Sequence, residues 1–197
     1  MKLFGSKKRE IWQRLSQELG GAMHSSWRGD KVQIAHEEWV ITLDTYVVMA
    51  NNAPIFFTRI RAPFVNRSEF RLSIRRRNVF SDLAVWLGAQ DVEIGQPDFD
   101  QAFVLKANNE PRLLELLRDQ ELLRRLDAQP TLSLSVKDNE GWFGATFTEH
   151  VDELYFSVHG VITDTDRLKE LFELFSYTLD RLVITGSAEP IAPDVAL

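Results

Sequence analysis

The sequence predicts an α+β fold in which antiparallel sheets pack against helices, and two observations lead to this prediction. Between residues 31 and 77, short apolar segments alternate with turn residues, which is typical of neighbouring strands in an antiparallel meander. Apolar residues also recur at helical spacing before and after these strands. Residues 103–107 and 131–162 repeat the strand pattern, so each half of the chain follows an order of helix, strands and helix.

This layout predicts two α+β halves, residues 1–90 and residues 91–197, packed as one globular unit. The similar order of elements is consistent with a duplicated helix–strands–helix unit, and the sequence leaves this open. A length of 197 residues suits one large domain or two small domains packed together. The hydrophobic content of 44% and the charged content of 26% are ordinary for a folded soluble protein.

The first half is expected to begin with a helix over residues 7–19, because apolar residues recur at helical spacing and Gly20-Gly21 forms a natural end. Ser81 is placed to cap a further short helix over residues 82–88. Turn residues such as Asn51-Asn52-Ala53-Pro54 separate the strands between these helices. The strands are expected at 31–36, 38–48, 55–62 and 69–77.

The second half is expected to begin with a strand over residues 103–107, followed by one or two helices across 111–126 that end before Pro130. A last long helix should start near Asp164-Thr165-Asp166, where acidic side chains suit the helix dipole, and end at Gly186. Three strands precede it, at 131–137, 141–148 and 153–162. Its buried stripe should consist of Leu168, Leu171, Phe172, Phe175, Leu179 and Leu182.

Composition excludes several classes of function. The chain has no cysteine, which excludes disulfides, thiolate nucleophiles and cysteine-based metal centres. The net charge of −6 argues against a general nucleic-acid binder. Since no apolar run approaches the ~20 residues that a membrane-spanning helix needs, no transmembrane segment is predicted and the cytoplasm is the expected location.

Motifs for catalysis or cofactor binding are absent from the sequence. There is no GxGxxG, P-loop, GxSxG or HExxH pattern, so no cofactor is predicted. The four histidines, His24, His36, His150 and His159, do not stand at metal-ligand spacing, so no metal site is predicted either. An enzyme remains an open alternative that no motif supports.

Residues 57–78 form the least random charge pattern, because they hold seven arginines and one acid, Glu69. Alternation along a strand places Arg59 and Arg61 on one face. If strands 55–62 and 69–77 pair as a hairpin, five guanidinium groups share one sheet face, which suits an anionic partner because arginine binds carboxylates and phosphates in a bidentate fork. The candidate anion-binding or partner-binding residues are Arg59, Arg61, Arg71, Arg75 and Arg77.

Three explanations of the arginine cluster stay open. Carboxylates of the acidic segment 91–100, whose sequence is DVEIGQPDFD, could fold back and neutralise it within the chain. An external anionic partner could bind it instead. The cluster could also be an ordinary solvated sheet face. Exposed ion pairs contribute only ~0–1 kcal/mol each to stability, so stability does not require the cluster.

The acidic segment itself is best interpreted as a local connector. Asp98 and Asp100 do not follow the spacing of a calcium loop, and neighbours at i and i+2 do not specify a glycosidase pair. Pro97 fixes the entry, Asp98 can accept backbone N–H bonds in an Asx-turn or cap, and Phe99 and Phe103 are spaced to pack together.

Seven short segments give the chain a resemblance to a family of uncharacterised bacterial proteins. The segments are WRGDKV (27–32), WVITLDTY (39–46), FSDL (80–83), DVEIGQPDFDQAF (91–103), GWFG (141–144), VDELYF (151–156) and ITGSA (184–188). The resemblance covers nearly the whole chain. It implies a stand-alone bacterial cytoplasmic protein and implies no activity, cofactor or site residue.

The leading hypothesis is therefore a non-catalytic bacterial protein that binds another macromolecule through the arginine-rich sheet face, and the expected partner is a protein. One alternative is an enzyme of unknown reaction with carboxylates and arginines in a cleft between the halves. Another is peripheral binding to an anionic membrane surface through the basic first helix, which begins with Lys7, Lys8 and Arg9. The oligomeric state is not predicted.

Overall fold

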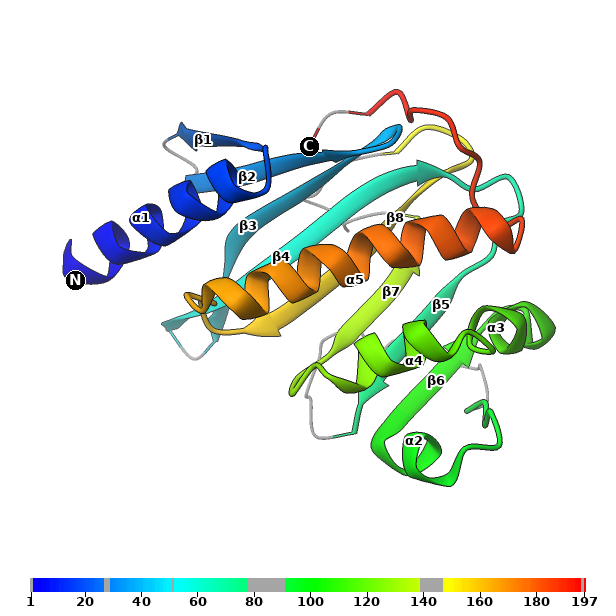
Figure 1. Ribbon diagram of the computed structural model, residues 1–197. Helices are drawn as coiled ribbons and strands as arrows, with labels where there is room; N and C mark the ends of the chain where they lie inside the picture. Colours follow the sequence, from blue (N-terminus) through cyan, green and yellow to red (C-terminus); the bar gives the residue numbers. More distant parts are fainter. Residues whose placement is uncertain (1, 27–28, 51, 78–90, 139–146, 196) are drawn as a thin grey trace.

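The computed structural model confirms an α+β fold built on one antiparallel sheet of eight strands, in the order β1-β2-β3-β4-β8-β7-β5-β6 (Figure 1). It describes residues 2–26, 29–50, 52–77, 91–138, 147–195 and 197, and the statements below concern these residues. The strands are β1 (Ala22–Ser26), β2 (Gly29–His36), β3 (Trp39–Ala50), β4 (Ala53–Val65), β5 (Leu72–Arg76), β6 (Phe103–Ala107), β7 (Ser133–Lys137) and β8 (Val151–His159).

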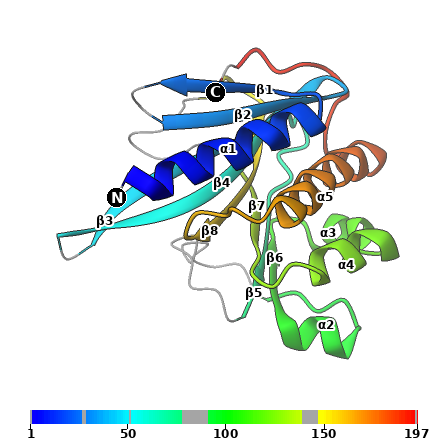
Figure 2. The same ribbon diagram turned by 60° about the vertical axis from the view of Figure 1, so that its left-hand side comes forward.

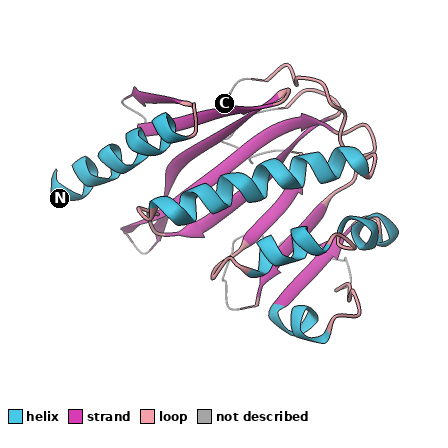
Figure 3. Cartoon of the chain, in the orientation of Figure 1, coloured by secondary structure: helices cyan, strands magenta, loops and turns pink. Residues whose placement is uncertain are grey.

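The helices pack on one face of the sheet, with α5 running across its middle and α4 beside it (Figures 1 and 3). We call the opposite face the open face. By strand alternation it carries the side chains of Thr42, Asp44, Arg59, Arg61 and Tyr155. The helices are α1 (Lys2–Glu18), α2 (Pro97–Ala102), α3 (Glu110–Leu116), α4 (Gln120–Asp127) and α5 (Thr165–Ile184).

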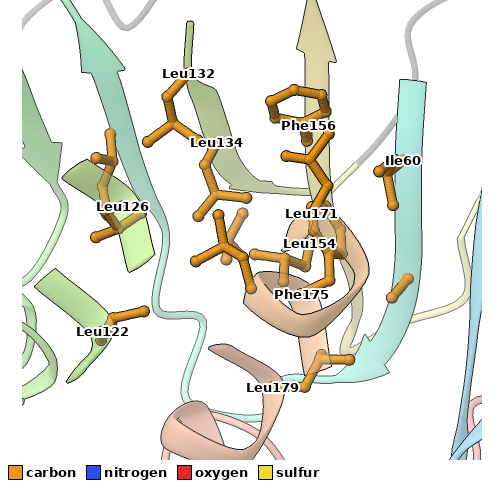
Figure 4. Close-up of a cluster of buried hydrophobic side chains, with 14 of the residues drawn as sticks. Ile60, Leu122, Leu126, Leu132, Leu134, Leu154, Phe156, Leu171, Phe175 and Leu179 are labelled. Atoms are coloured by element: carbon orange, nitrogen blue, oxygen red, sulfur yellow. The ribbon is translucent and has the colours of Figure 1, made fainter. Parts of the chain in front are cut away.

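The core lies between the central strands and α5 (Figure 4). Alternate residues of β4 and β8 point towards the helix, among them Ile60, Leu154 and Phe156, and all three are fully buried. From α5, Phe175 meets Phe156 edge to face, with ring centroids 6.5 Å apart. The stripe predicted from helical spacing is confirmed, since its six residues are buried: Leu168, Leu171, Phe172, Phe175, Leu179 and Leu182.

α1 packs on the protein's own sheet, as the spacing of its apolar residues indicates. Trp12 and Leu15 are fully buried, and the indole N–H of Trp12 donates to the carbonyl of Ile162 at 3.2 Å. The helix starts at Lys2, earlier than expected, and is followed by Gly20 at a φ of 66°. Glycine adopts this left-handed conformation without strain, so the sequence correctly marks the end of the helix.

The two predicted halves contribute to a single sheet. β5 lies between β6 and β7, so a strand of residues 1–90 is inserted among strands of residues 91–197. The division at residue 90 and the duplication stay predictions. β1 was missed because its side chains are mostly exposed and give no apolar alternation. The helix predicted at 82–88 and most of the strand at 141–148 lie outside the described residues.

Asp119 caps α4 and connects it to α5. Its carboxylate accepts the Leu122 N–H and the Tyr177 hydroxyl, each at 2.8 Å, and lies 3.5 Å from Arg181 Nε. Burial raises the pKa of this carboxyl, but these donors and the charge of Arg181 lower it more, so its pKa lies below the ordinary value. The ionised form is therefore the one that stabilises the fold.

Replacing Asp119 by alanine should lower the free energy of unfolding by about 1 kcal/mol, the usual cost of losing a cap. Because the folded pKa is lowered, the charge-dependent part of this stabilisation is complete above about pH 4 and is lost as pH falls through the folded pKa. Urea unfolding between pH 2 and pH 7 tests this. Asp119→Asn, which keeps the acceptor oxygen, should lose the part of the pH dependence that Asp119 contributes but less stability. A pH dependence equal to that of the unchanged chain in both variants would contradict the assignment.

Candidate functional site

The β3–β4 hairpin extends beyond the rest of the sheet, as Figure 2 shows. β2 pairs with β3 only as far as Leu43, and β8 pairs with β4 only from Thr58. We call residues 45–57 the hairpin end. Within the part of the chain that the structure describes, its two strands pair with each other and make one further bridge, from Phe57 to Gly160. A two-stranded ribbon without neighbouring strands has most of its surface available for contact.

On the side of the helices, the hairpin end exposes three large apolar side chains. Val47 is 48% exposed, Met49 66% and Phe56 45%. Val47 stands directly opposite Phe56 in the register, and Met49 stands opposite Pro54. Residues 45–57 contain no charged side chain. These residues therefore form one uncharged apolar surface, of the kind that marks an interaction site.

On the open face, aromatic rings hold the base of the hairpin end. Tyr46 and Phe57 stack with centroids 5.0 Å apart, and His159 meets the edge of Phe57 at 5.7 Å. The guanidinium of Arg59 lies 5.3 Å from the centroid of the Tyr46 ring. Paired aromatic rings across two strands stabilise such a ribbon, so these contacts order the residues at the base of the hairpin end.

Arg59 and Arg61, two of the predicted site residues, share one carboxylate. Asp44, across the hairpin, accepts two bonds from Arg59 at 2.8 Å each and one from Arg61 at 2.7 Å. The three side chains are largely buried, with exposed fractions of 18%, 7% and 15% for Arg59, Arg61 and Asp44. The nearest counter-charge is thus a residue of β3, and not a residue of the acidic segment.

The five candidate arginines do not form one hairpin surface, because β4 and β5 do not pair; β8 and β7 lie between them. Arg71 meets Asp138 at 2.8 Å and Asp152 at 3.7 Å. Arg75 lies on β5, and Arg77 follows that strand and donates to the backbone carbonyl of Asp100 at 3.2 Å. The expectation of a shared hairpin was wrong because sequence proximity does not determine which strands of a large sheet become neighbours.

The acidic segment is a connector, as its local pattern indicates, although no backbone N–H among the described residues donates to Asp98 as predicted. Pro97 opens α2, and Phe99 stacks on Phe103 with centroids 4.3 Å apart. Asp100 accepts the backbone N–H of Ile94 at 2.9 Å. Elsewhere in the segment, the Asp91 carboxylate forms an ion pair with a lysine of β6, since its Oδ1 lies 3.7 Å from Lys106 Nζ.

Asp98 also lines a shallow groove of about 510 Å³ between the start of α2 and α4. Arg124 and Asp127 contribute to its wall, whereas Arg59 and Arg61 do not. The groove therefore does not bring a carboxylate of the acidic segment to Arg59 or Arg61. Within the part of the chain that the structure describes, no three acidic or histidine side chains are placed to hold a metal ion.

The open face also carries buried ionisable groups on β8, Glu153 and Tyr155. Lys137 Nζ lies 3.5 Å from Glu153 and 3.1 Å from the centroid of the Tyr155 ring. Burial, together with the neighbouring Tyr46 hydroxyl, raises the pKa of Tyr155 well above its ordinary value. Tyr155 therefore stays neutral under all ordinary conditions.

The sequence patterns described above did not predict the apolar hairpin end. A signal was available, because residues 45–58 hold no charge while both flanks do. Alternation alone predicts only that one face of a strand is buried. It does not show that β3 and β4 extend beyond the neighbouring strands.

Comparison with models of protein families finds no match, and comparison with curated proteins finds none either. Among solved structures, the chain is similar to the mycobacterial trehalose monomycolate transport factor A, TtfA, with a TM-score of 0.46 and 10% sequence identity over 96% of this chain and 98% of that chain. At this level the similarity carries no argument about function. None of the helices in the described ranges is long and apolar enough to cross a bilayer. The bacterial family resemblance and the cytoplasmic location stay predictions.

Proposed function

We propose that this protein is a non-catalytic module that binds another protein, and that the hairpin end is its contact surface. The observation that carries the proposal is the apolar surface of Val47, Met49 and Phe56 on a ribbon that extends beyond the sheet. Exposed apolar side chains of this size are enriched at protein interfaces, Met and Phe in particular.

The contacts at the base of the ribbon support this proposal. A partner gains more from a surface that is already ordered, because less conformational entropy is lost on binding. The stacked Tyr46 and Phe57 rings and the Asp44 ion pairs order the base. In this proposal Arg59 and Arg61 support the ribbon; that the arginines also meet an anionic group of the partner stays a prediction.

Capture of partners from native cells, followed by mass spectrometry, tests the proposal with matched variants. Met49→Asp places a charge in the apolar surface and should reduce recovery of a specific partner at least about tenfold, since burying an uncompensated carboxylate is costly. Ile184→Asp is the control, because Ile184 is as exposed as Met49, at 67% against 66%, and lies at the end of α5.

A protein that the unchanged chain and the Ile184→Asp variant recover, and that the Met49→Asp variant does not, would support the hairpin end as the contact surface. Both variants should show an unchanged melting temperature, so that loss of capture is not loss of folding. Identical recovery by all three chains, or recovery of no specific protein, would contradict the proposal.

A further inference from the structure

The last residues of the chain cross the open face of the sheet. After α5, Ser187 and Ala188 are buried, and the N–H of Glu189 donates to the carbonyl of Val65 at 2.9 Å. We call residues 189–197 the tail. It continues over the strands β2, β3 and β4, and Lys31 Nζ donates to the carbonyl oxygen of Leu197 at 2.6 Å.

The tail covers a groove that it does not fill. A cavity of about 240 Å³ lies between the tail and the sheet. On the sheet side, Val40 supplies an apolar wall and keeps 45% of its surface exposed. Further residues of the sheet side are Gln33, Glu38, Thr42 and Pro63, and the tail contributes Ala192, Pro193, Val195 and Leu197.

Few interactions hold the tail. Its bridge to Val65 is at its start, and among its described residues beyond Glu189 none makes a backbone hydrogen bond to the sheet. Pro193, Val195 and Leu197 are only half-buried. Pro193 has no N–H to satisfy, so the segment can lie across the strands without joining their ladder. Beyond Glu189, whose carboxylate also lies 3.3 Å from Arg67 Nε, the polar contact that the described tail residues make with the sheet is the Lys31 bond, so apolar side chains make most of the contact.

We propose that the tail is an intramolecular ligand of a peptide-binding groove on the open face, formed by β2, β3 and β4. The groove takes an extended, apolar, proline-containing segment of another protein, which displaces the tail and places a backbone carbonyl or a carboxylate against Lys31. This inference does not depend on the hairpin end, because it rests on a different face of β3 and on the tail contacts.

A tethered ligand reduces the apparent affinity of the groove for a free one. The tail occupies the groove at an effective concentration of about millimolar order, so the apparent Kd for an external peptide is the intrinsic Kd divided by the fraction of time that the groove is open. Substitutions that detach the tail should therefore tighten binding of the external peptide. Substitutions in the groove wall should weaken it whether or not the tail is attached.

The test uses a labelled synthetic peptide with the sequence of residues 189–197, EPIAPDVAL, titrated into full-length variants and followed by fluorescence anisotropy. Val195→Asp with Leu197→Asp detaches the tail and leaves the sheet side of the groove intact. Its Kd for the peptide should be at least about tenfold lower than that of the unchanged chain. Asp194→Asn is the matched tail control, because Asp194 is exposed and does not line the groove, and it should leave the Kd unchanged.

Adding Val40→Asp to the detached variant should abolish this tightened binding. Three results would each overturn the inference: the detached variant fails to bind the peptide, the detached variant and the unchanged chain bind it equally, or binding survives Val40→Asp. Retained melting temperatures show that each variant is folded.

Discussion

Phe156→Ala is expected to lower the free energy of unfolding by about 3–5 kcal/mol, the range for removing a buried phenylalanine from a close-packed core. Phe156 lies on β8 in the middle of the sheet and is fully buried. It meets Phe175 of α5 edge to face (Figure 4), so alanine leaves a cavity between the sheet and its longest helix. Urea unfolding followed by circular dichroism measures the change.

Phe56→Ala is the control for this prediction. The residue is of the same type and also lies in a central strand, but it is on the hairpin end and 45% exposed. Its loss should cost less than about 1 kcal/mol, because little apolar surface is returned to water. Equal destabilisation by the two substitutions would mean that the core is not centred between β8 and α5.

Asp44→Ala is expected to lower the free energy of unfolding by about 3 kcal/mol. Removing one partner of a buried ion pair costs more than the pair contributes, because the remaining charge stays desolvated. Here one carboxylate meets the guanidinium groups of both Arg59 and Arg61, which are largely buried. The value lies at the low end of the usual range because Asp44 keeps 15% of its side chain exposed.

Glu121→Ala provides the comparison, because Glu121 pairs with Arg124 at a similar distance of 2.7 Å on the exposed surface of α4. Exposed pairs of this kind contribute about 0–1 kcal/mol. Chemical denaturation at pH 7 distinguishes the two sites. If Asp44→Ala costs no more than Glu121→Ala, then burial does not make the Asp44 contacts important, and their support of the hairpin base must be abandoned.

Local patterns predicted much of the fold. Alternation placed Arg59 and Arg61 on one face of β4, where both meet Asp44, because successive side chains of a strand point to opposite faces. Helical spacing identified the stripe of α5. The Phe99–Phe103 pair followed from a spacing of four residues. These predictions succeeded because each depends on residues that are near one another in the chain.

Non-local pairing could not be predicted in the same way. Nothing local indicates that β4 has β8 as its neighbour, or that β5 inserts between β6 and β7. The Asp44–Arg59 contact lies between these two cases, because it joins neighbouring strands of one hairpin and could have been predicted from the loop between them. The structure pairs Ala50 with Ala53, so two residues separate the strands and position 44 falls opposite position 59. A two-residue loop at Asn51-Asn52, read from the sequence, would have given that register.

Site-specific photo-crosslinking in the native cell tests the protein-binding proposal most directly. A photoreactive side chain at position 49 lies on the apolar hairpin end, and one at position 184 lies at an equally exposed place on α5. We predict a protein adduct of defined mass from position 49 and none from position 184. The same adducts from both positions, a lipid adduct instead of a protein, or no adduct from position 49 would contradict a protein partner at the hairpin end.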